Sequence, residues 1–293
     1  MKRILLVGLV LLVCGATAPV WGTLHYFVND SISIEINDYE YPYDQIRYLH
    51  GTSTWINNLY NLKIAFWDGS TIWEYNTTTI PNGFTGLKEV QSWTVTGTDP
   101  HQTAHVILGD HATTPSFTID LTIHMEGDGF KGFRSDYVIT AVTGSLSNAK
   151  LYLYGDPRIS NDDWTNRSAY SAAEDLFYVY DIANTPNLWW GVARSCVAPC
   201  DSPPMHYYGH HYTGSYGTDP MRAYMTAGSN LPDIADNTEG NQVAAWNWDL
   251  GTFSGSVSFT IYMGLGTDLA DLVEEVKAPI FRDGFETGGA GWW

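Results

Sequence analysis

Three histidines within six residues form the densest group of potential metal-binding side chains in this 293-residue sequence. They are His206, His210 and His211, in the segment Met-His-Tyr-Tyr-Gly-His-His-Tyr. Neutral imidazole is a common metal ligand, so the group could form a metal site. No Glu lies between them, unlike in helical zinc-hydrolase motifs, and on a strand His211 would face away from the other two. A loop that packs tyrosine rings and exposes its histidines is the simpler interpretation.

Aromatic residues near these histidines are the candidates for a ligand contact. Aromatic faces bind sugar rings by stacking, while polar groups at the rim satisfy the hydroxyls. We expect residues 195–219 to form a surface loop over one end of the fold, where it contributes to ligand contact or, alternatively, covers an apolar sheet end. Trp190 could also leave the core, because it follows another tryptophan and the two point to opposite faces of a strand. The predicted ligand-binding residues are Tyr207, Tyr208, Tyr212, Tyr216 and Trp190.

Two cysteines lie at the base of this expected loop. Cys196 and Cys200 are four residues apart in a turn-rich stretch, and in an oxidising compartment they could form a local disulfide. Closing so short a loop would contribute only about 2 kcal/mol in the loop-entropy account.

Carboxylates cluster along the sequence between residues 156 and 181, near the predicted strand ends. A glycoside hydrolase needs two of them roughly 5–10 Å apart, which a sequence does not reveal, and several of these segments also favour plain turns. We find neither a Gly-x-Ser-x-Gly nucleophile motif nor a glycine-rich phosphate loop in the sequence. The carboxylates are Asp156, Asp162, Asp163, Glu174, Asp175 and Asp181.

Structural calcium is the one cofactor for which we find candidate segments. Residues 126–130 (Glu-Gly-Asp-Gly-Phe) and 161–163 (Asn-Asp-Asp) could each donate oxygen atoms. Neither has the full spacing of an EF-hand loop, so a plain turn explains each of them as well.

Alternation of apolar and polar residues with a period of two recurs along the chain and indicates strands. One helix is indicated, over residues 268–276, with Thr267 as its cap and Pro279 as its end. The sequence therefore predicts an all-β fold, a large antiparallel β-sandwich over residues 23–279 with one short C-terminal helix. The clearest alternating segments are 31–36, 62–67, 117–124, 136–142, 150–154, 176–180, 188–193 and 257–262.

The N-terminus has the three-part pattern of a secretory signal peptide. Lys2 and Arg3 precede an apolar run over residues 4–13, followed by small residues, and cleavage after Gly22 fits best. The apolar run is shorter than the roughly 20 residues that span a bilayer. We therefore predict an exported protein with no transmembrane segment, located in the periplasm, at the cell surface or in the medium.

The formal net charge of −18 limits the kinds of partner that the chain can bind. So acidic a chain repels nucleic acid, and we expect a glycan or a cell-surface component instead. The sequence does not determine the oligomeric state.

The last residues resemble the Asp-Gly-Phe-Glu-Ser-Gly…Trp ending of many exported proteins of Gram-negative bacteria. The matching residues are Asp283, Gly284, Phe285, Glu286, Gly288 and Trp292. The resemblance implies export and a flexible tail over residues 280–293, and it implies no activity.

The second half of the chain resembles the supersandwich β domains related to galactose mutarotases, which accompany many carbohydrate-active enzymes. The similarity lies in the order of structural motifs, which implies the fold, and no catalytic His/Glu set of the mutarotases can be carried over. The motifs are Gly155-Asp156, Tyr180-Asp181, Trp190-Gly191, Ala245-Trp246, Leu250-Gly251 and Gly255.

Taken together, the aromatic-rich composition without a catalytic motif predicts a noncatalytic binding or surface-structural protein that engages carbohydrate through aromatic side chains. One alternative is a carbohydrate-active enzyme, a glycoside hydrolase or epimerase-like enzyme that uses a carboxylate pair. The other is a purely structural protein of the extracellular matrix or cell surface.

Overall fold

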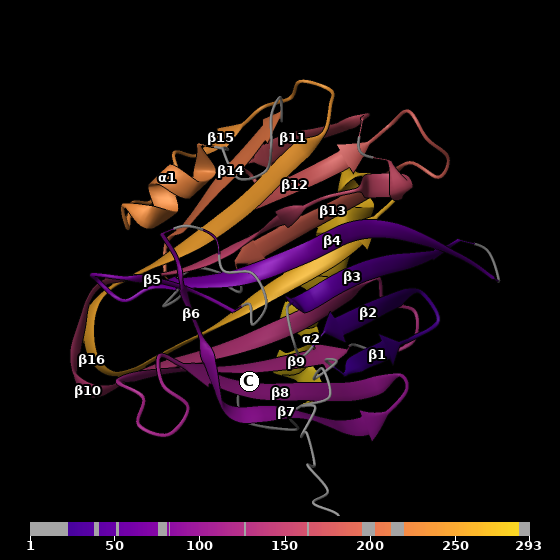
Figure 1. Cartoon of the computed structure of the whole chain (residues 1–293). Helices are drawn as coiled ribbons and strands as arrows, with labels where there is room; N and C mark the ends of the chain where they lie inside the picture. The colour runs from indigo at the N-terminus through magenta and orange to yellow at the C-terminus, as the bar shows by residue number, and fades with distance from the viewer. Residues whose placement is uncertain are drawn as a thin grey trace, which may run out of the picture.

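The computed structural model describes residues 23–37, 41–50, 53–75, 81, 83–125, 127–162, 164–194, 203–211 and 220–286. Two 25-residue strands, β10 (Gly132–Asp156) and β16 (Gln242–Gly266), run antiparallel to each other along both of their halves. Their register shifts between Ala141 and Lys150, where both strands bend together at the left of Figure 1. Gly251 and Gly255 lie in this bend with φ of 66° and 79°, a backbone conformation that favours glycine. The bend divides one continuous sheet into two layers.

The first layer, sheet I, contains the first half of β10 and the second half of β16. On one side of this pair lie β9, β8 and β7, and on the other lie β13, β12 and β11. The added strands are β7 (Lys88–Thr98), β8 (His101–Gly109), β9 (Phe117–Met125), β11 (Asn166–Ser171), β12 (Leu176–Asp181) and β13 (Leu188–Arg194).

The second layer, sheet II, contains the second half of β10 and the first half of β16. It continues through β4 to β1 on one side and through β14 to β15 on the other. The added strands are β1 (Leu24–Val28), β2 (Ile32–Asn37), β3 (Tyr41–His50), β4 (Thr54–Trp67), β5 (Ile72–Glu74), β6 (Thr85–Gly86), β14 (Met205–His211) and β15 (Ile234–Ala235).

The main core lies between the layers and follows from the alternation in the sequence. Along β9, every second side chain from Phe117 to Met125 is buried and the residues between them are partly exposed. Trp190 and Trp246 meet edge to face in this core, with ring centroids 4.8 Å apart. The predicted all-β sandwich is thus confirmed.

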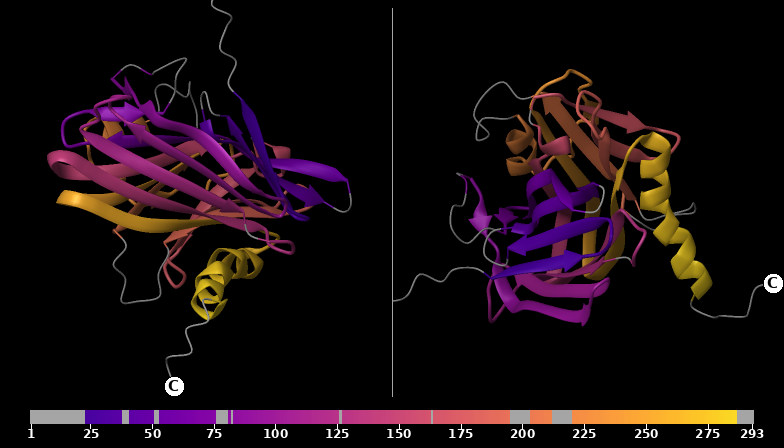
Figure 2. Two further views of the ribbon diagram at one scale, coloured as in Figure 1. Left: turned by 90° about the horizontal axis from the view of Figure 1, so that it is seen from below. Right: turned by 90° about the vertical axis from the view of Figure 1, so that its right-hand side faces the viewer.

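Helix α2 (Leu269–Glu286) lies outside the two layers, against the outer face of sheet I (Figure 2). Leu272 and Val276 are fully buried there, over glycines that allow a close approach: a Cβ on Gly266 would lie 2.4 Å from the backbone nitrogen of Leu272. The helix continues past Pro279, at which we expected it to end, because a proline removes its own N–H bond and bends a helix without always ending it.

Two further short helices were not predicted, η1 (Ile159–Asn161) and α1 (Met221–Thr226). Met221 and Met225 of α1 cover the outer face of sheet II next to Tyr152 and Tyr154. Six residues are too few to produce a clear helical period in a sequence. Within the described residues, no helix is long and apolar enough to cross a membrane.

Candidate functional site

The part of sheet I that carries β8, β9 and β10 has an open, polar outer face. Two histidine–aspartate pairs cross between its strands: His105 Nε2 lies 2.8 Å from Asp120 Oδ1, and His124 Nε2 lies 3.0 Å from Asp136 Oδ2. The four side chains are 27–38% exposed, so a ligand can reach them. We call these four residues the His–Asp face.

Each imidazole is oriented by its carboxylate through Nε2, and its Nδ1 lies at a long distance from a neighbouring polar atom. His105 Nδ1 lies 3.3 Å from Gln91 Nε2, and His124 Nδ1 lies 3.4 Å from Thr103 Oγ1. These distances are at the outer limit of hydrogen bonding, so a ligand hydroxyl can replace either contact. A histidine oriented by an aspartate is the arrangement that general acid–base catalysis uses.

The register of the strands sets the spacing of the two imidazoles. Thr103 of β8 pairs with His124 of β9, and His105 pairs with Thr122. The histidines are therefore diagonal neighbours, roughly 7–8 Å apart. Both side chains belong to the same face of the sheet, where a small molecule would lie near both of them.

Asp136 is held in its ionised form. Burial raises the pKa of its carboxyl, but hydrogen bonds from His124 and Thr260 together with the charge of Arg134 outweigh burial and hold the pKa below its usual value. Thr260 Oγ1 donates to Asp136 Oδ1 over 2.6 Å. Asp136 therefore suits the role of orienting His124 better than that of a proton donor.

The predicted histidine group lies on strand β14, which pairs with β16. The expected surface loop is therefore wrong for residues 205–211, which form a strand. This strand was not predicted, because its partner β16 is distant in the sequence and leaves no local signal. His206 and His210 share one face and His211 lies on the other, as alternation requires; His206 pairs with Asp233 over 3.0 Å. Among the described residues, no group of three His, Cys, Asp or Glu side chains could hold a metal ion.

Of the predicted aromatic contacts that the structure describes, Tyr208 and Trp190 are buried and Tyr207 is partly buried against the core. The ring of Tyr207 stacks on Tyr170, with centroids 4.4 Å apart. Tyr208 is 2% exposed, and Trp190 is fully buried. Tyr212 and Tyr216 lie outside the described residues, as do Cys196, Cys200, the signal peptide and residues 287–293.

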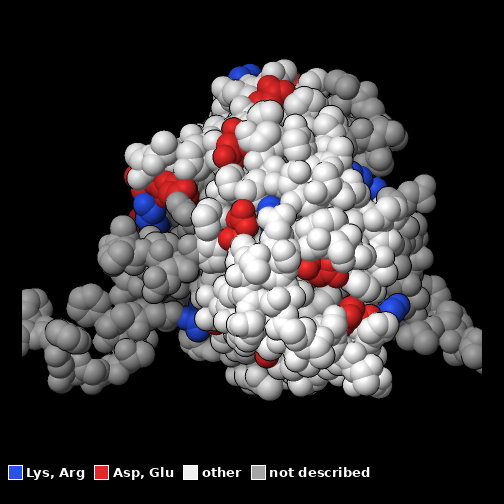
Figure 3. Space-filling view, turned by 90° about the vertical axis from the view of Figure 1, so that its left-hand side faces the viewer, with Lys and Arg blue, Asp and Glu red and all other residues white. Residues whose placement is uncertain are grey.

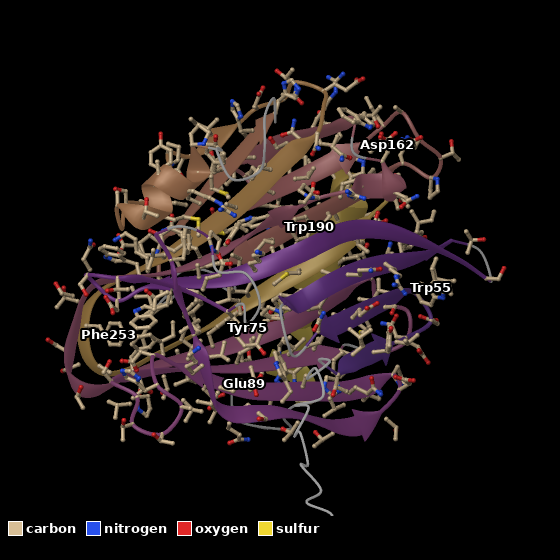
Figure 4. The ribbon with its side chains drawn as sticks, viewed as in Figure 1. Trp55, Tyr75, Glu89, Asp162, Trp190 and Phe253 are labelled. Carbon is tan, nitrogen blue, oxygen red and sulfur yellow. The ribbon has the colours of Figure 1, made fainter. Side chains whose placement is uncertain are left out.

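Of the predicted carboxylates, the structure brings Asp162 and Asp181 together. Asn184 Nδ2 donates to both, over 3.0 Å to Asp162 Oδ2 and 2.6 Å to Asp181 Oδ2. Both aspartates also accept turn N–H groups, from Trp164 and Ala183 respectively. The pair therefore stabilises neighbouring turns at the end of the sandwich, where Figure 4 labels Asp162.

The other predicted carboxylates that the structure describes each have a different partner. Glu174 pairs with Lys277, Asp175 accepts a hydrogen bond from Tyr170, and Asp156 lies 3.6 Å from Arg158. Asp163 lies outside the described residues.

The first calcium candidate, over residues 126–130, is a turn tied to the N-terminal strands. Asp30 Oδ1 accepts the Gly129 N–H over 2.7 Å, and Asp128 Oδ1 accepts the Asp30 N–H over 3.2 Å. Glu126 lies outside the described residues.

The His–Asp face was not predicted from the sequence, because its members are scattered along the chain. The only local signal is that Asp120 and His124 occupy polar positions of the alternating segment 117–124. Their partners come from β8 and β10, and only the register of three strands brings them together.

Comparison with solved structures identifies proteins of similar fold. A bacterial glucoamylase complexed with acarbose matches at a TM-score of 0.57 and 12% identity, covering 91% of this chain and 37% of that one. A GalM/aldose epimerase homologue from C. elegans matches at a TM-score of 0.45 and 6% identity, covering 84% of this chain and 99% of that one. A heparinase III matches at a TM-score of 0.42 and 9% identity, covering 85% of this chain and 35% of that one. No protein-family model and no curated protein matches the sequence. The chain thus spans little more than a third of the glucoamylase.

This comparison corrects one prediction and supports another. A noncatalytic binding or surface-structural protein was expected, but the chain shares its fold with a bacterial glucoamylase, so the comparison favours the enzymatic alternative. An aldose epimerase homologue, the class of protein named by the resemblance in the second half of the chain, is among the matching structures.

Proposed function

We propose that this chain is a carbohydrate-active enzyme of the epimerase-like kind, in which His105 and His124 act as acid and base on one sugar. The His–Asp face carries this proposal, because it places two oriented, solvent-accessible imidazoles side by side on one sheet. The alternative from the sequence had a carboxylate pair act on the sugar, whereas in this proposal Asp120 and Asp136 orient the two histidines.

The reaction that fits two imidazoles is the interconversion of sugar anomers. One neutral imidazole takes the proton of the anomeric hydroxyl while the other, protonated, donates a proton to the ring oxygen. The bond between the anomeric carbon and the ring oxygen breaks, and a carbonyl forms in an open-chain sugar. Rotation about the next carbon–carbon bond and reversal of both proton transfers close the ring as the other anomer, so no further reactant is required.

Sugar as the substrate class is supported by the fold shared with the glucoamylase and by the side chains around the histidines. Thr103, Thr122 and Thr260 lie on the same face, and their hydroxyls can exchange hydrogen bonds with those of a sugar. The net charge of −18 favours neutral sugars over anionic ones. Figure 3 shows the acidic side chains scattered over one face of the molecule instead of gathered in a patch.

Proton NMR of freshly dissolved single-anomer hexoses tests the proposal. We expect the purified protein to shorten the time to anomeric equilibrium, while heat-denatured protein does not. Acceleration of no hexose in the panel would contradict the proposal. Release of sugar from glycosides without anomer exchange would retain a carbohydrate-active enzyme but overturn the role given to the two histidines.

A further inference from the structure

Trp164 is far more exposed than the other large aromatic residues that the structure describes. Its exposed fraction is 74%, whereas Trp190, Trp246 and Trp248 are completely buried. Leaving an indole in water forgoes roughly 1.5–3 kcal/mol of burial. So exposed an aromatic ring is therefore a candidate binding residue.

The segment that carries Trp164 is fixed from both sides. The Trp164 N–H donates to Asp162 Oδ1 over 2.7 Å. The fully buried Asn166 donates from Nδ2 to the carbonyls of Pro157 and Asp162, over 3.0 and 2.7 Å. A ligand that binds Trp164 therefore does not have to order this backbone, which lowers the entropic cost of binding.

The neighbouring turn supplies both a second apolar group and a polar rim. Asn184 ties this turn to the Trp164 segment through its bonds to Asp162 and Asp181, and Ile182 in the same turn is 54% exposed. Asp162 accepts hydrogen bonds from Trp164, Asn184 and Thr165, and a carboxylate offers about four acceptor positions. Asp162 can therefore accept a further bond from a ligand hydroxyl.

We propose that Trp164 and Asp162 form a binding site for one ring of a neutral glycan, separate from the His–Asp face. The indole would stack on the C–H face of the sugar, and Asp162 would accept a hydroxyl at the rim. Sulfated and uronic-acid sugars are disfavoured, because Asp162 at the rim is acidic and no described Lys or Arg is paired with it. The site lies at the ends of β11 and β12, whereas the His–Asp face belongs to β8, β9 and β10.

Isothermal titration calorimetry tests this site without relying on catalysis. The probes are neutral gluco-, galacto- and manno-hexasaccharides, with a chondroitin sulfate hexasaccharide as the anionic comparison. We expect at least one neutral probe to bind the full chain and the sulfated one not to bind. Trp164→Ala should weaken that binding about tenfold or more, whereas Trp164→Phe, which keeps an aromatic face, should retain most of it.

Trp55→Ala is the matched control, because Trp55 is also exposed, at 39%, and lies in the β3–β4 hairpin (Figure 4). The Trp55→Ala variant should bind the probe as tightly as the unchanged protein does. Both alanine variants should have the melting temperature of the unchanged protein. The proposal is overturned if no neutral probe binds, if Trp164→Ala binds normally, or if Trp55→Ala loses as much affinity. The Asp136→Asn variant, changed in the His–Asp face, should still bind the neutral probe. Failure of the catalytic proposal would therefore leave glycan binding at Trp164 intact.

Discussion

The two histidines of the His–Asp face differ from the aromatic residues of β14 in what surrounds them. His105 and His124 lie over a solvated sheet face and keep one ring nitrogen in a long contact. Tyr207 and Tyr208 are held by ring packing within the molecule. At the residue scale, the environment and not the residue type decides which side chain can act on a ligand.

This contrast predicts that Tyr208 supports stability. Tyr208→Ala removes a ring that is 2% exposed and packed beside Met221 and Met225. We expect a loss of about 3 kcal/mol in the free energy of unfolding, which corresponds to a melting temperature about 6–12 °C lower for a domain of this size. Tyr26, 49% exposed, provides the control; Tyr26→Ala should change stability by less than about 0.5 kcal/mol. Equal melting temperatures for the two variants would show that Tyr208 is not packed as described.

Helix α2 shows how an element is fixed on sheet I by charge as well as by apolar contact. Lys131, which precedes β10, pairs with Asp271 and lies 3.4 Å from Glu275, one helical turn further on. Burial alone would raise the pKa of Asp271, but hydrogen bonds from Lys131 and Thr267 hold it below its usual value. At Glu275, burial outweighs the same lysine and raises the pKa.

The two carboxylates should therefore affect stability with opposite signs. Asp271 stabilises the fold above its ordinary pKa of 3.8, and this contribution is lost as the pH falls through its lowered folded value. Ionised Glu275 lowers stability once the pH rises from 4.5 through its raised folded value. In urea unfolding at pH 7, Asp271→Asn should cost about 1 kcal/mol, and Glu275→Gln should leave stability unchanged or slightly higher.

Repeating the urea unfolding at pH 3 provides the control for this assignment. The deficit of Asp271→Asn should shrink there, because below its ordinary pKa of 3.8 the carboxyl binds a proton in the unfolded chain, which removes part of the stabilisation of the unchanged protein. If both variants lose the same stability at pH 7, the opposite pKa shifts are wrong.

The strands could be predicted from the sequence wherever one face is buried. Phe117 to Met125 alternates because one face meets the core, so its pattern is local. Segment 205–211 could not be assigned, because Gly209 and the histidines conceal a strand whose partner β16 is more than thirty residues away. The same limit applies to the site: Asp136 and His124 are close only because of strand register.

At the scale of the whole molecule, β10 and β16 hold the two layers together and place distinct surfaces on sheet I. The His–Asp face lies over β8 to β10, α2 covers the middle (Figures 1 and 2), and the Trp164 segment directly precedes the edge strand β11. Catalysis and glycan binding are thus assigned to different parts of one rigid sheet.

The rate of anomer exchange in histidine variants tests the central claim most directly. His105→Ala and His124→Ala should each lower the acceleration about 100-fold or more, the contribution expected of an acid–base group. His206 provides a matched control, because it also pairs with an aspartate, Asp233, but lies on sheet II; His206→Ala should retain the full rate. Full acceleration after both His105 and His124 are replaced would contradict the assignment of this face as the active site. An equal loss of acceleration in His206→Ala would contradict it as well.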